Sequence, residues 1–260
     1  MPGVSSETIE FSKGATVLAG TIEKPEGEPI GAAVFAHCFT CTRTSLAAVT
    51  ISRTLASHGI ACLRFDFTGL GGSGGDFGES GFTCDVADVV AAVAAMRARV
   101  GGKILLVGHS LGGAAVLAAA SELDEDAVAA VATIGAPADV PHVLRTIKGD
   151  LAAIEQSGSG PVSIGGRPFT IDRAFLERTR QADLLTKVAI LRTPLMICHS
   201  PTDEVVGVEN AGKLFATAIH PKSFLSLGPA DHLLQDKAEA RFAGNVIAAW
   251  AARYLGEQFL

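Results

Sequence analysis

The sequence contains no long run of basic residues, and its formal net charge is −6 at pH 7. Proteins bind nucleic acids through clustered Lys and Arg side chains, so a nucleic-acid partner is not expected. The longest apolar runs, such as "DVVAAVAAM", are too short and too interrupted to span a bilayer. The first residues also lack the positive start and apolar stretch of a signal peptide. We therefore expect a cytoplasmic protein with neither a nucleic-acid nor a membrane partner.

Cysteine is scarce, and the five residues are Cys38, Cys41, Cys62, Cys84 and Cys198. The odd count and low density differ from those of a disulfide-stapled domain. Cys62 and Cys198 lie inside apolar runs and are expected to be small core residues. Cys38 and Cys41 form a C-x-x-C in "HCFTCTRTS", but no second pair supplies the remaining ligands of a zinc site. A thioredoxin-like pair would begin a helix in a much smaller fold. We expect no metal and no cofactor, and the role of this pair stays open.

Apolar runs alternate with helical patterns along most of the 260 residues. Weak alternation over the first 25 residues or so predicts an antiparallel hairpin. The expected strands are 31–37, 60–67, 103–108, 127–136, 194–200 and 222–227. The expected helices are 45–59, 85–100, 110–123, 207–219 and 241–255. Strands and helices at this interval imply right-handed crossovers and a mostly parallel, twisted sheet with helices on both faces.

The alternation stops between residues 137 and 193. This segment contains two or three amphipathic helical patterns around a Gly/Ser-rich stretch, "QSGSGPVSIGGRP", and no apolar run of the earlier kind. The chain shows no internal repeat and no long linker. We therefore expect a single α/β domain over 1–260 with a helical cap inserted at about 137–193. The sequence does not indicate an oligomeric state.

The segment Gly108-His109-Ser110-Leu111-Gly112 has the pattern G-x-S-x-G and joins an expected strand to an expected helix. A sharp turn of this kind forces its central residue to a positive φ and requires glycine at the crowded flanking positions. The hydroxyl of Ser110 then projects above the carboxyl edge of the sheet, where α/β sheets bind ligands. We interpret Ser110 as a nucleophile on a nucleophile elbow. The alternative is a glycine-rich turn that only allows close helix packing.

A serine hydroxyl needs a base to become a good nucleophile. In proteins with this elbow, the acid and then the histidine follow along the chain. His232, in "GPADHLLQ", follows the last expected strand and can reach Ser110, whereas His220 lies at the opposite edge. The acid is expected from "HSPTDEVVGVENA", in which Asp203 is the first carboxylate to clear the strand. Glu204 is its competitor.

In these roles, His232 deprotonates Ser110, which attacks a carbonyl and forms an acyl-enzyme that water then hydrolyses. The oxyanion needs backbone donors. One is the N–H of Leu111, and the second is expected to be the N–H of Phe39 in "HCFTCTRTS". From the residues, the predicted function is acyl transfer from a small-molecule carbonyl substrate to Ser110 and then to water. Thioester hydrolysis, amide hydrolysis and acyl transfer could use the same residues, and a non-catalytic binding protein on this fold is a further alternative.

Several segments together resemble one family: "AHCFTCTRTS", "LRFDFTGLGGSGGDF", "GHSLGGAAVLAAA", "ATIGAPADVPHV", "SIGGRPF", "HSPTDEVVG" and "HPKSFLSLGPADHLL". Over nearly its whole length the chain resembles the hydrolase half of bacterial bifunctional α/β hydrolase/OsmC proteins. The resemblance implies the α/β-hydrolase fold and a serine esterase for small acyl esters, with Ser110, Asp203 and His232 matching the triad. In that family an OsmC-type peroxide-reducing domain follows. No OsmC domain is expected here, because the chain ends at "RYLGEQFL".

The expected cap carries apolar residues that either form an acyl pocket or simply pack the cap onto the sheet. These residues are Leu144, Leu151, Ile154, Phe169, Phe175 and Leu176. A cap of this modest size favours short or medium acyl chains. Asp66, in "DFTGLGGSGG", is interpreted as a structural residue that ties down a glycine-rich turn. Arg43 is expected to hold the oxyanion loop, to contact substrate or to be a surface charge.

Overall fold

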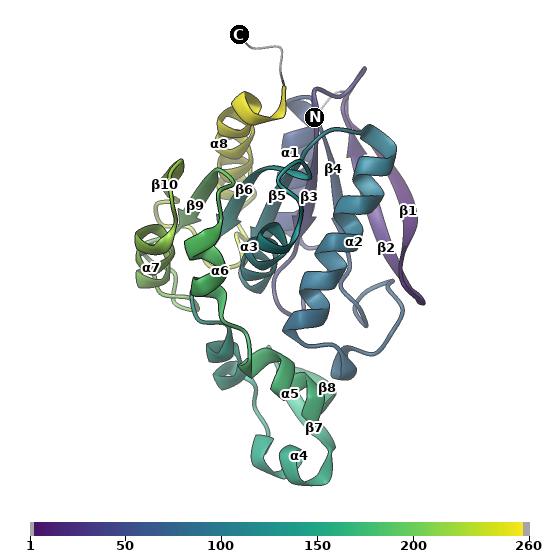
Figure 1. The fold of residues 1–260 in the computed structure, drawn as a ribbon, viewed down its shortest axis with the longest axis vertical. Helices are drawn as coiled ribbons and strands as arrows, with labels where there is room; N and C mark the ends of the chain where they lie inside the picture. Colours follow the sequence, from purple (N-terminus) through teal and green to yellow (C-terminus); the bar gives the residue numbers. More distant parts are fainter. Residues whose placement is uncertain (1–2, 257–260) are drawn as a thin grey trace.

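A mostly parallel β-sheet forms the centre of the molecule (Figure 1). In the computed structural model, which describes residues 3–256, this sheet has eight strands in the order β1-β2-β4-β3-β5-β6-β9-β10. The strands are β1 (Ser5–Lys13), β2 (Thr16–Lys24), β3 (Gly31–Ala36), β4 (Ile60–Phe65), β5 (Ile104–His109), β6 (Val128–Ile134), β9 (Leu195–His199) and β10 (Lys222–Ser226). Only the pairs β1–β2 and β2–β4, at one edge of the described sheet, are antiparallel. The predicted mostly parallel sheet is confirmed.

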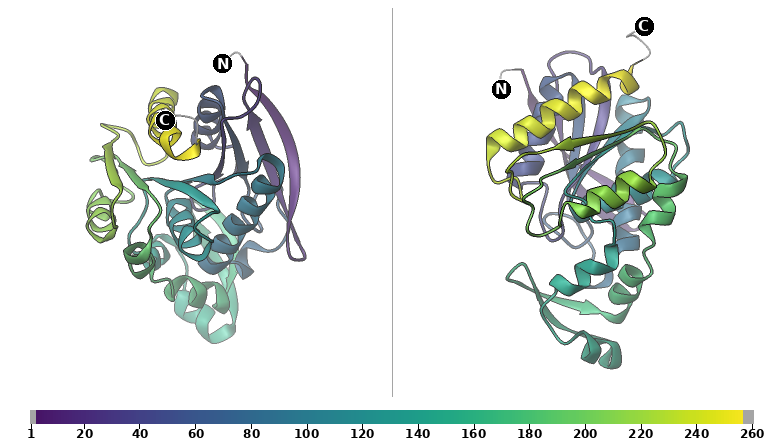
Figure 2. Two further views of the ribbon diagram at one scale, coloured as in Figure 1. Left: turned by 45° about the horizontal axis from the view of Figure 1, so that its top comes forward. Right: turned by 90° about the vertical axis from the view of Figure 1, so that its left-hand side faces the viewer.

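Helices cover both faces of this sheet (Figures 1 and 2). They are α1 (Leu46–Ser57), α2 (Phe82–Val100), α3 (Leu111–Glu122), α4 (Leu151–Ser157), α5 (Arg173–Arg180), α6 (Leu184–Ile190), α7 (Glu209–Thr217) and α8 (Lys237–Leu255), with 3-10 turns η1 (Phe77–Glu79) and η2 (Val140–Thr146). Helices α1 and α8 pack on one face, and α2, α3, α6 and α7 pack on the other. Among residues 3–256, no helix combines the length and apolar character needed to cross a bilayer.

The central strands are apolar along their whole length because helices bury them on both sides. Every residue of β4, β5 and β6 is buried. Alternate side chains of β5 enter different cores: Leu105 and Val107 face α1 and α8, whereas Ile104 and Leu106 face α2 and α3. This packing on both faces fixes where β5 ends relative to its neighbouring strands, and it therefore also fixes the position of the turn that follows β5.

The cap differs from the predicted helical insertion. It contains η2, α4, α5 and α6, but also the hairpin of β7 (Ser159–Ile164) and β8 (Arg167–Asp172). Gly165 and Gly166 form the hairpin turn, both at positive φ (57° and 80°), as the tightest hairpin connections require. Short strands with few apolar residues resemble a loop in sequence, which is why the Gly/Ser-rich stretch was not recognised as a hairpin. The right-hand view of Figure 2 shows the cap at the end of the molecule opposite the last turns of α8.

Candidate active site

The turn between β5 and α3 holds Ser110 in a strained conformation. Ser110 has φ 55° and ψ −124°, a region that non-glycine residues rarely adopt. A Cβ on Gly108 would collide with the carbonyl of Gly112, and a Cβ on Gly112 would collide with the carbonyls of Ala36 and His37. The first glycine therefore permits the tight turn, and the second permits contact with the end of β3. As a result, the Ser110 side chain stands at the carboxyl edge of the sheet.

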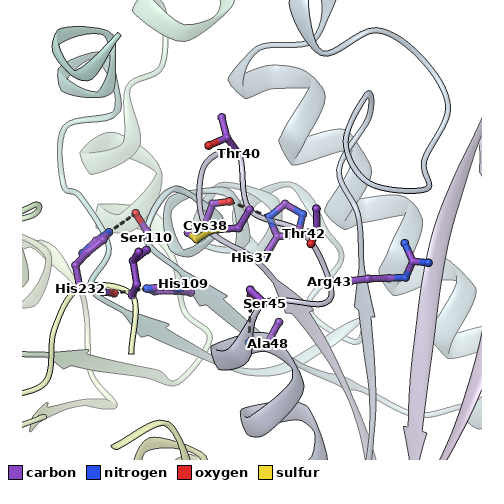
Figure 3. Close-up of a disulfide and its surroundings, with 12 residues drawn as sticks. His37, Cys38, Thr40, Thr42, Arg43, Ser45, Ala48, His109, Ser110 and His232 are labelled. Carbon is purple, nitrogen blue, oxygen red and sulfur yellow. Dashed lines mark hydrogen bonds between the residues drawn. A yellow bond between two sulfur atoms is a disulfide. The ribbon is translucent and has the colours of Figure 1, made fainter. Parts of the chain in front are cut away.

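Three segments far apart in the sequence converge on this side chain. His232 Nε2 lies 2.9 Å from Ser110 Oγ, and His232 Nδ1 lies 2.7 Å from Asp203 Oδ2. An ionised carboxylate only accepts hydrogen bonds, so Nδ1 carries the proton and Nε2 accepts from the serine hydroxyl. Figure 3 shows the Ser110–His232 contact at the end of the strand that carries His109. The structure thus brings together the three residues that the sequence singled out as nucleophile, base and acid.

Asp203 is held rigidly behind the histidine. Its Oδ1 accepts the N–H groups of Val205 and Val206, each at 2.9 Å, which leaves Oδ2 for His232. Burial on its own raises the pKa of Asp203, but the hydrogen bonds from His232 and from the two backbone N–H groups outweigh it and lower the pKa. The carboxylate is therefore charged at neutral pH. Glu204, the competing acid, is exposed.

His109 holds the backbone of His232 in place. Its Nε2 donates to the backbone carbonyl of His232 at 2.7 Å, and the side chain is almost completely buried. Burial, together with the neighbouring His232 ring, lowers the pKa of His109 to about 4. His109 therefore remains neutral in the folded protein at pH 7 and acts as a fixed donor that positions the His232 loop.

The depressed pKa of His109 has a measurable effect on stability. Between about pH 6.5 and pH 4 the unfolded chain binds a proton here that the folded chain does not, so acid favours unfolding. His109→Gln keeps a donor but cannot titrate. As the pH falls, the free energy of unfolding of this variant should therefore decrease less steeply than that of wild type, with slopes that differ by up to about 1.4 kcal/mol per pH unit. Urea unfolding of both proteins across this window measures the difference. Equal slopes would show that His109 does not carry the depressed pKa.

Two backbone N–H groups near Ser110 are available to an oxyanion. Within residues 3–256, neither the N–H of Phe39 nor that of Leu111 donates a hydrogen bond to the protein. Both residues line the same cavity as Ser110 and His232. Unused donors at the end of β3 and at the first residue of α3 are the arrangement expected of an oxyanion hole.

The loop that carries Phe39 is held in place by Asp66 and Arg64. Asp66 accepts the backbone N–H of Arg43 at 2.6 Å and that of Gly72 at 2.8 Å, and it pairs with the Arg43 guanidinium. Arg64 donates to the carbonyl of Arg43 at 2.8 Å. Asp66 therefore has the structural place that we expected of it. Arg43 holds the loop and does not line the cavity around Ser110.

Cys38 and Cys41 form a disulfide, with their Cα atoms 5.3 Å apart. The sequence led us to interpret this stretch as a loop in which the cysteines had no defined role. The C-x-x-C spacing was a real signal of a bonded pair, although no metal-ligand set accompanies it. Figure 3 shows the disulfide on the loop between His37 and Thr42, next to Ser110. Cys62 and Cys198 are free and buried, as expected for small core residues.

A cavity of about 480 Å³ opens above Ser110. From the cap, the residues that line it are Pro137, Asp139, His142, Val143, Thr146, Ile164 and Gly165. Further lining comes from the segment 205–213 and from His232 and Leu233. None of the six apolar cap residues that we considered for an acyl pocket lines this cavity. Instead, they pack in or against the core, so the simpler interpretation of them applies.

Two residues near the histidine and the carboxylate were not identified from the sequence. Gly135, at φ 56°, follows β6, and a Cβ there would lie 3.2 Å from Asp203 Oδ2 and 3.5 Å from His232 Nδ1. His199 ends β9, is fully buried and donates from Nε2 to the carbonyl of Val206 at 2.7 Å. A glycine directly after a buried strand was the available signal for the first. No local pattern pointed to the second.

Comparison with known proteins gives related folds and one close relative. A model of the alpha/beta hydrolase family matches residues 33–256. The esterase domain of a Rhodothermus marinus protein is 46% identical, covers 97% of this chain and 99% of that one, and has a TM-score of 0.77. Est1E from Butyrivibrio proteoclasticus, solved with ferulic acid, is 20% identical (93% and 98% covered, TM-score 0.81) and shows a similar fold. No curated protein matches the chain.

Proposed function

The chain belongs to the alpha/beta hydrolase family, and from this premise we propose that it is a serine esterase that hydrolyses carboxylic esters through Ser110, His232 and Asp203. The observation that carries the proposal is the continuous hydrogen-bonded series from Ser110 Oγ through both ring nitrogens of His232 to Asp203. The ester substrate class is supported by the similar Rhodothermus marinus structure, which is an esterase domain. The resemblance to OsmC fusion proteins and the cytoplasmic location remain proposals from sequence.

The first half of the reaction forms an acyl-enzyme. His232 Nε2 removes the hydroxyl proton as Ser110 Oγ attacks the ester carbonyl, and Asp203 stabilises the imidazolium that results. The developing oxyanion accepts the N–H groups of Phe39 and Leu111, which have no other partner among the described residues. His232 then gives its proton to the departing alkoxide, which leaves as an alcohol.

The second half releases the acid. Water enters the position that the alcohol has left, and His232 Nε2 removes its proton as it attacks the acyl carbon. The same two N–H groups stabilise the second oxyanion. Collapse of this intermediate breaks the ester bond to Ser110, and the proton on His232 returns to Oγ. The protein recovers its starting state without a cofactor.

The cavity favours esters with short to medium acyl chains. Its volume of about 480 Å³ lies at the small end of ligand sites and must hold both acyl and alcohol groups. In a series of p-nitrophenyl esters, kcat/KM should be highest at about two to six acyl carbons and at least about tenfold lower at twelve. Longer chains must pass the exposed side chains of Val205 and Leu233 into water. Highest kcat/KM on the longest chain would overturn this preference.

A second experiment compares the three substrate classes that the same residues could act on. Matched substrates with one acyl group as ester, thioester and anilide should give the highest kcat/KM on the ester, with the anilide lowest. Higher turnover of the thioester would replace the esterase assignment by a thioesterase one. Absence of turnover on all three, together with absence of fluorophosphonate labelling, would favour a non-catalytic binding protein.

A further inference from the structure

The oxyanion loop contains a four-residue ring that the proposed mechanism does not use. The disulfide closes residues 38–41, and the N–H of Cys41 donates to the carbonyl of Cys38 at 3.0 Å. Phe39, the second proposed oxyanion donor, lies inside this ring. Thr40, also inside it, has φ 58°, a left-handed conformation that is costly for a β-branched residue.

The direction of the Phe39 N–H depends on this ring. In a trans peptide the carbonyl of one residue and the N–H of the next point in opposite directions. The Cys38 carbonyl is held by His37 Nδ1 at 2.8 Å and by the N–H of Cys41. The disulfide holds Cys41 in place, so it also fixes the plane of the Cys38–Phe39 peptide. Figure 3 shows the His37 contact on the side of the loop away from His232.

A second contact holds the strained residue. The guanidinium of Arg167, at the start of β8 in the cap, donates to the carbonyl of Thr40 at 2.5 Å. A strained residue persists only where its surroundings over-determine its conformation. At Thr40 those surroundings are this hydrogen bond on one side and the disulfide on the other. After the disulfide is removed, only the long side chain of Arg167 therefore holds Thr40 in its strained conformation.

We propose that the Cys38–Cys41 disulfide is a reversible redox modification site that sets the competence of the oxyanion hole, an inference that rests on the proposed esterase function. In the oxidised form the N–H of Phe39 points into the cavity. In the reduced form the turn relaxes and this donor is lost for much of the time. In compartments that keep thiols reduced, protein disulfides typically serve redox sensing or catalysis rather than stapling.

The exchange requires only a small thiol and its disulfide, of the glutathione class. The thiolate attacks Sγ of Cys41, which is half-buried and more accessible than Cys38; the protein disulfide breaks, and the Cys38 thiolate takes up a proton. A second small thiolate attacks the sulfur of the small thiol in the mixed disulfide, which releases Cys41 and a small disulfide. Two electrons and two protons thus pass from two small thiols to the protein, and the reverse sequence restores the bond.

The test uses wild-type protein equilibrated in glutathione buffers of increasing reducing strength. Alkylation and mass spectrometry give the fraction of the 38–41 bond, and p-nitrophenyl acetate hydrolysis gives kcat and KM on the same samples. Loss of one oxyanion donor costs about 10²-fold to 10³-fold in kcat, so its partial loss should lower kcat by about tenfold or more. KM should change little, because the donor acts in the transition state. Reoxidation should restore kcat.

Matched variants separate this site from the remaining thiols. Cys38→Ser/Cys41→Ser should resemble the reduced enzyme and should not respond to glutathione, whereas Cys84→Ser should respond as wild type does. Cys84 is the partly exposed free cysteine of the described chain. Equal kcat in the oxidised and reduced wild type, or a redox response that survives in the double variant, would overturn the proposal. The wild-type comparison stands even if the double variant does not fold.

Amide hydrogen exchange across residues 38–42, measured on the same samples, keeps the two proposals distinguishable. If no sample hydrolyses ester, the esterase proposal fails, and the redox proposal is then judged on exchange alone. Faster exchange in this segment after reduction supports the structural role of the disulfide. Unchanged exchange refutes it whether or not the protein is an esterase.

Discussion

Ser110→Ala should lower kcat for p-nitrophenyl acetate by about 10⁶-fold, the loss expected when the nucleophile of a hydrogen-bonded triad is removed. Only the side chain of Ser110 changes, and it carries the hydroxyl that donates to His232 Nε2, with Oγ and Nε2 2.9 Å apart. Alanine leaves the φ of 55° and the neighbouring glycines as they are, so the fold should persist. Steady-state hydrolysis and covalent labelling with a fluorophosphonate measure the loss.

The control for this variant is Ser12→Ala, at an exposed position of the edge strand β1. It should hydrolyse and label as wild type does. Thermal unfolding of all three proteins checks that Ser110→Ala is folded. If Ser110→Ala retained more than about one hundredth of wild-type turnover, or labelled at wild-type rate, the nucleophile would lie elsewhere.

Asp203→Asn should lower kcat by about 10⁴-fold with little change in structure. The N–H groups of Val205 and Val206 require an acceptor, so the amide oxygen of asparagine should take the place of Oδ1. The amide NH₂ then faces His232 Nδ1, which must become an acceptor. That moves the ring proton to Nε2, and the atom facing Ser110 can no longer accept its proton.

Glu204→Gln is the matched control, because Glu204 is the neighbouring carboxylate and is exposed. Its kcat should stay within about twofold of wild type, as for most surface substitutions away from a site. The comparison also decides between the two acids that the sequence offered. A large loss in Glu204→Gln together with near-normal turnover in Asp203→Asn would assign the acid to Glu204.

Much of the fold followed from local sequence patterns. Strands such as Ile104–His109 are continuous apolar runs because both of their faces are covered, and each run lies next to a helical pattern of suitable length. The cap was harder to predict, because the hairpin Ser159–Asp172 is short and carries few apolar residues. The start of α2 was also displaced: the helix was expected over 85–100, but it begins at Phe82 with Gly81 as its N-cap.

The proposed nucleophile, base and acid could be told apart from the other serines, histidines and carboxylates because each follows a strand in the sequence. Parallel strands end at one edge of a sheet, so the residues after β5, β9 and β10 must meet there. This rule selects Ser110, Asp203 and His232 without any knowledge of side-chain packing. The lining of the cavity does not follow from it, because the cap residues that face Ser110 depend on where η2 and β7 lie in the folded cap.

The sequence by itself determined the elbow at Ser110 and the order in which Asp203 and His232 follow it. The turn is marked by the local spacing of its glycines, and the strand ends are marked by the ends of short apolar runs. Only the tertiary structure decided that the Phe39 N–H has no partner among the described residues and that Thr40 takes a left-handed conformation. The physical reason is that this turn depends on Thr40 at positive φ, whose carbonyl is held by Arg167, a residue 127 positions away. No local pattern can encode a contact of that range.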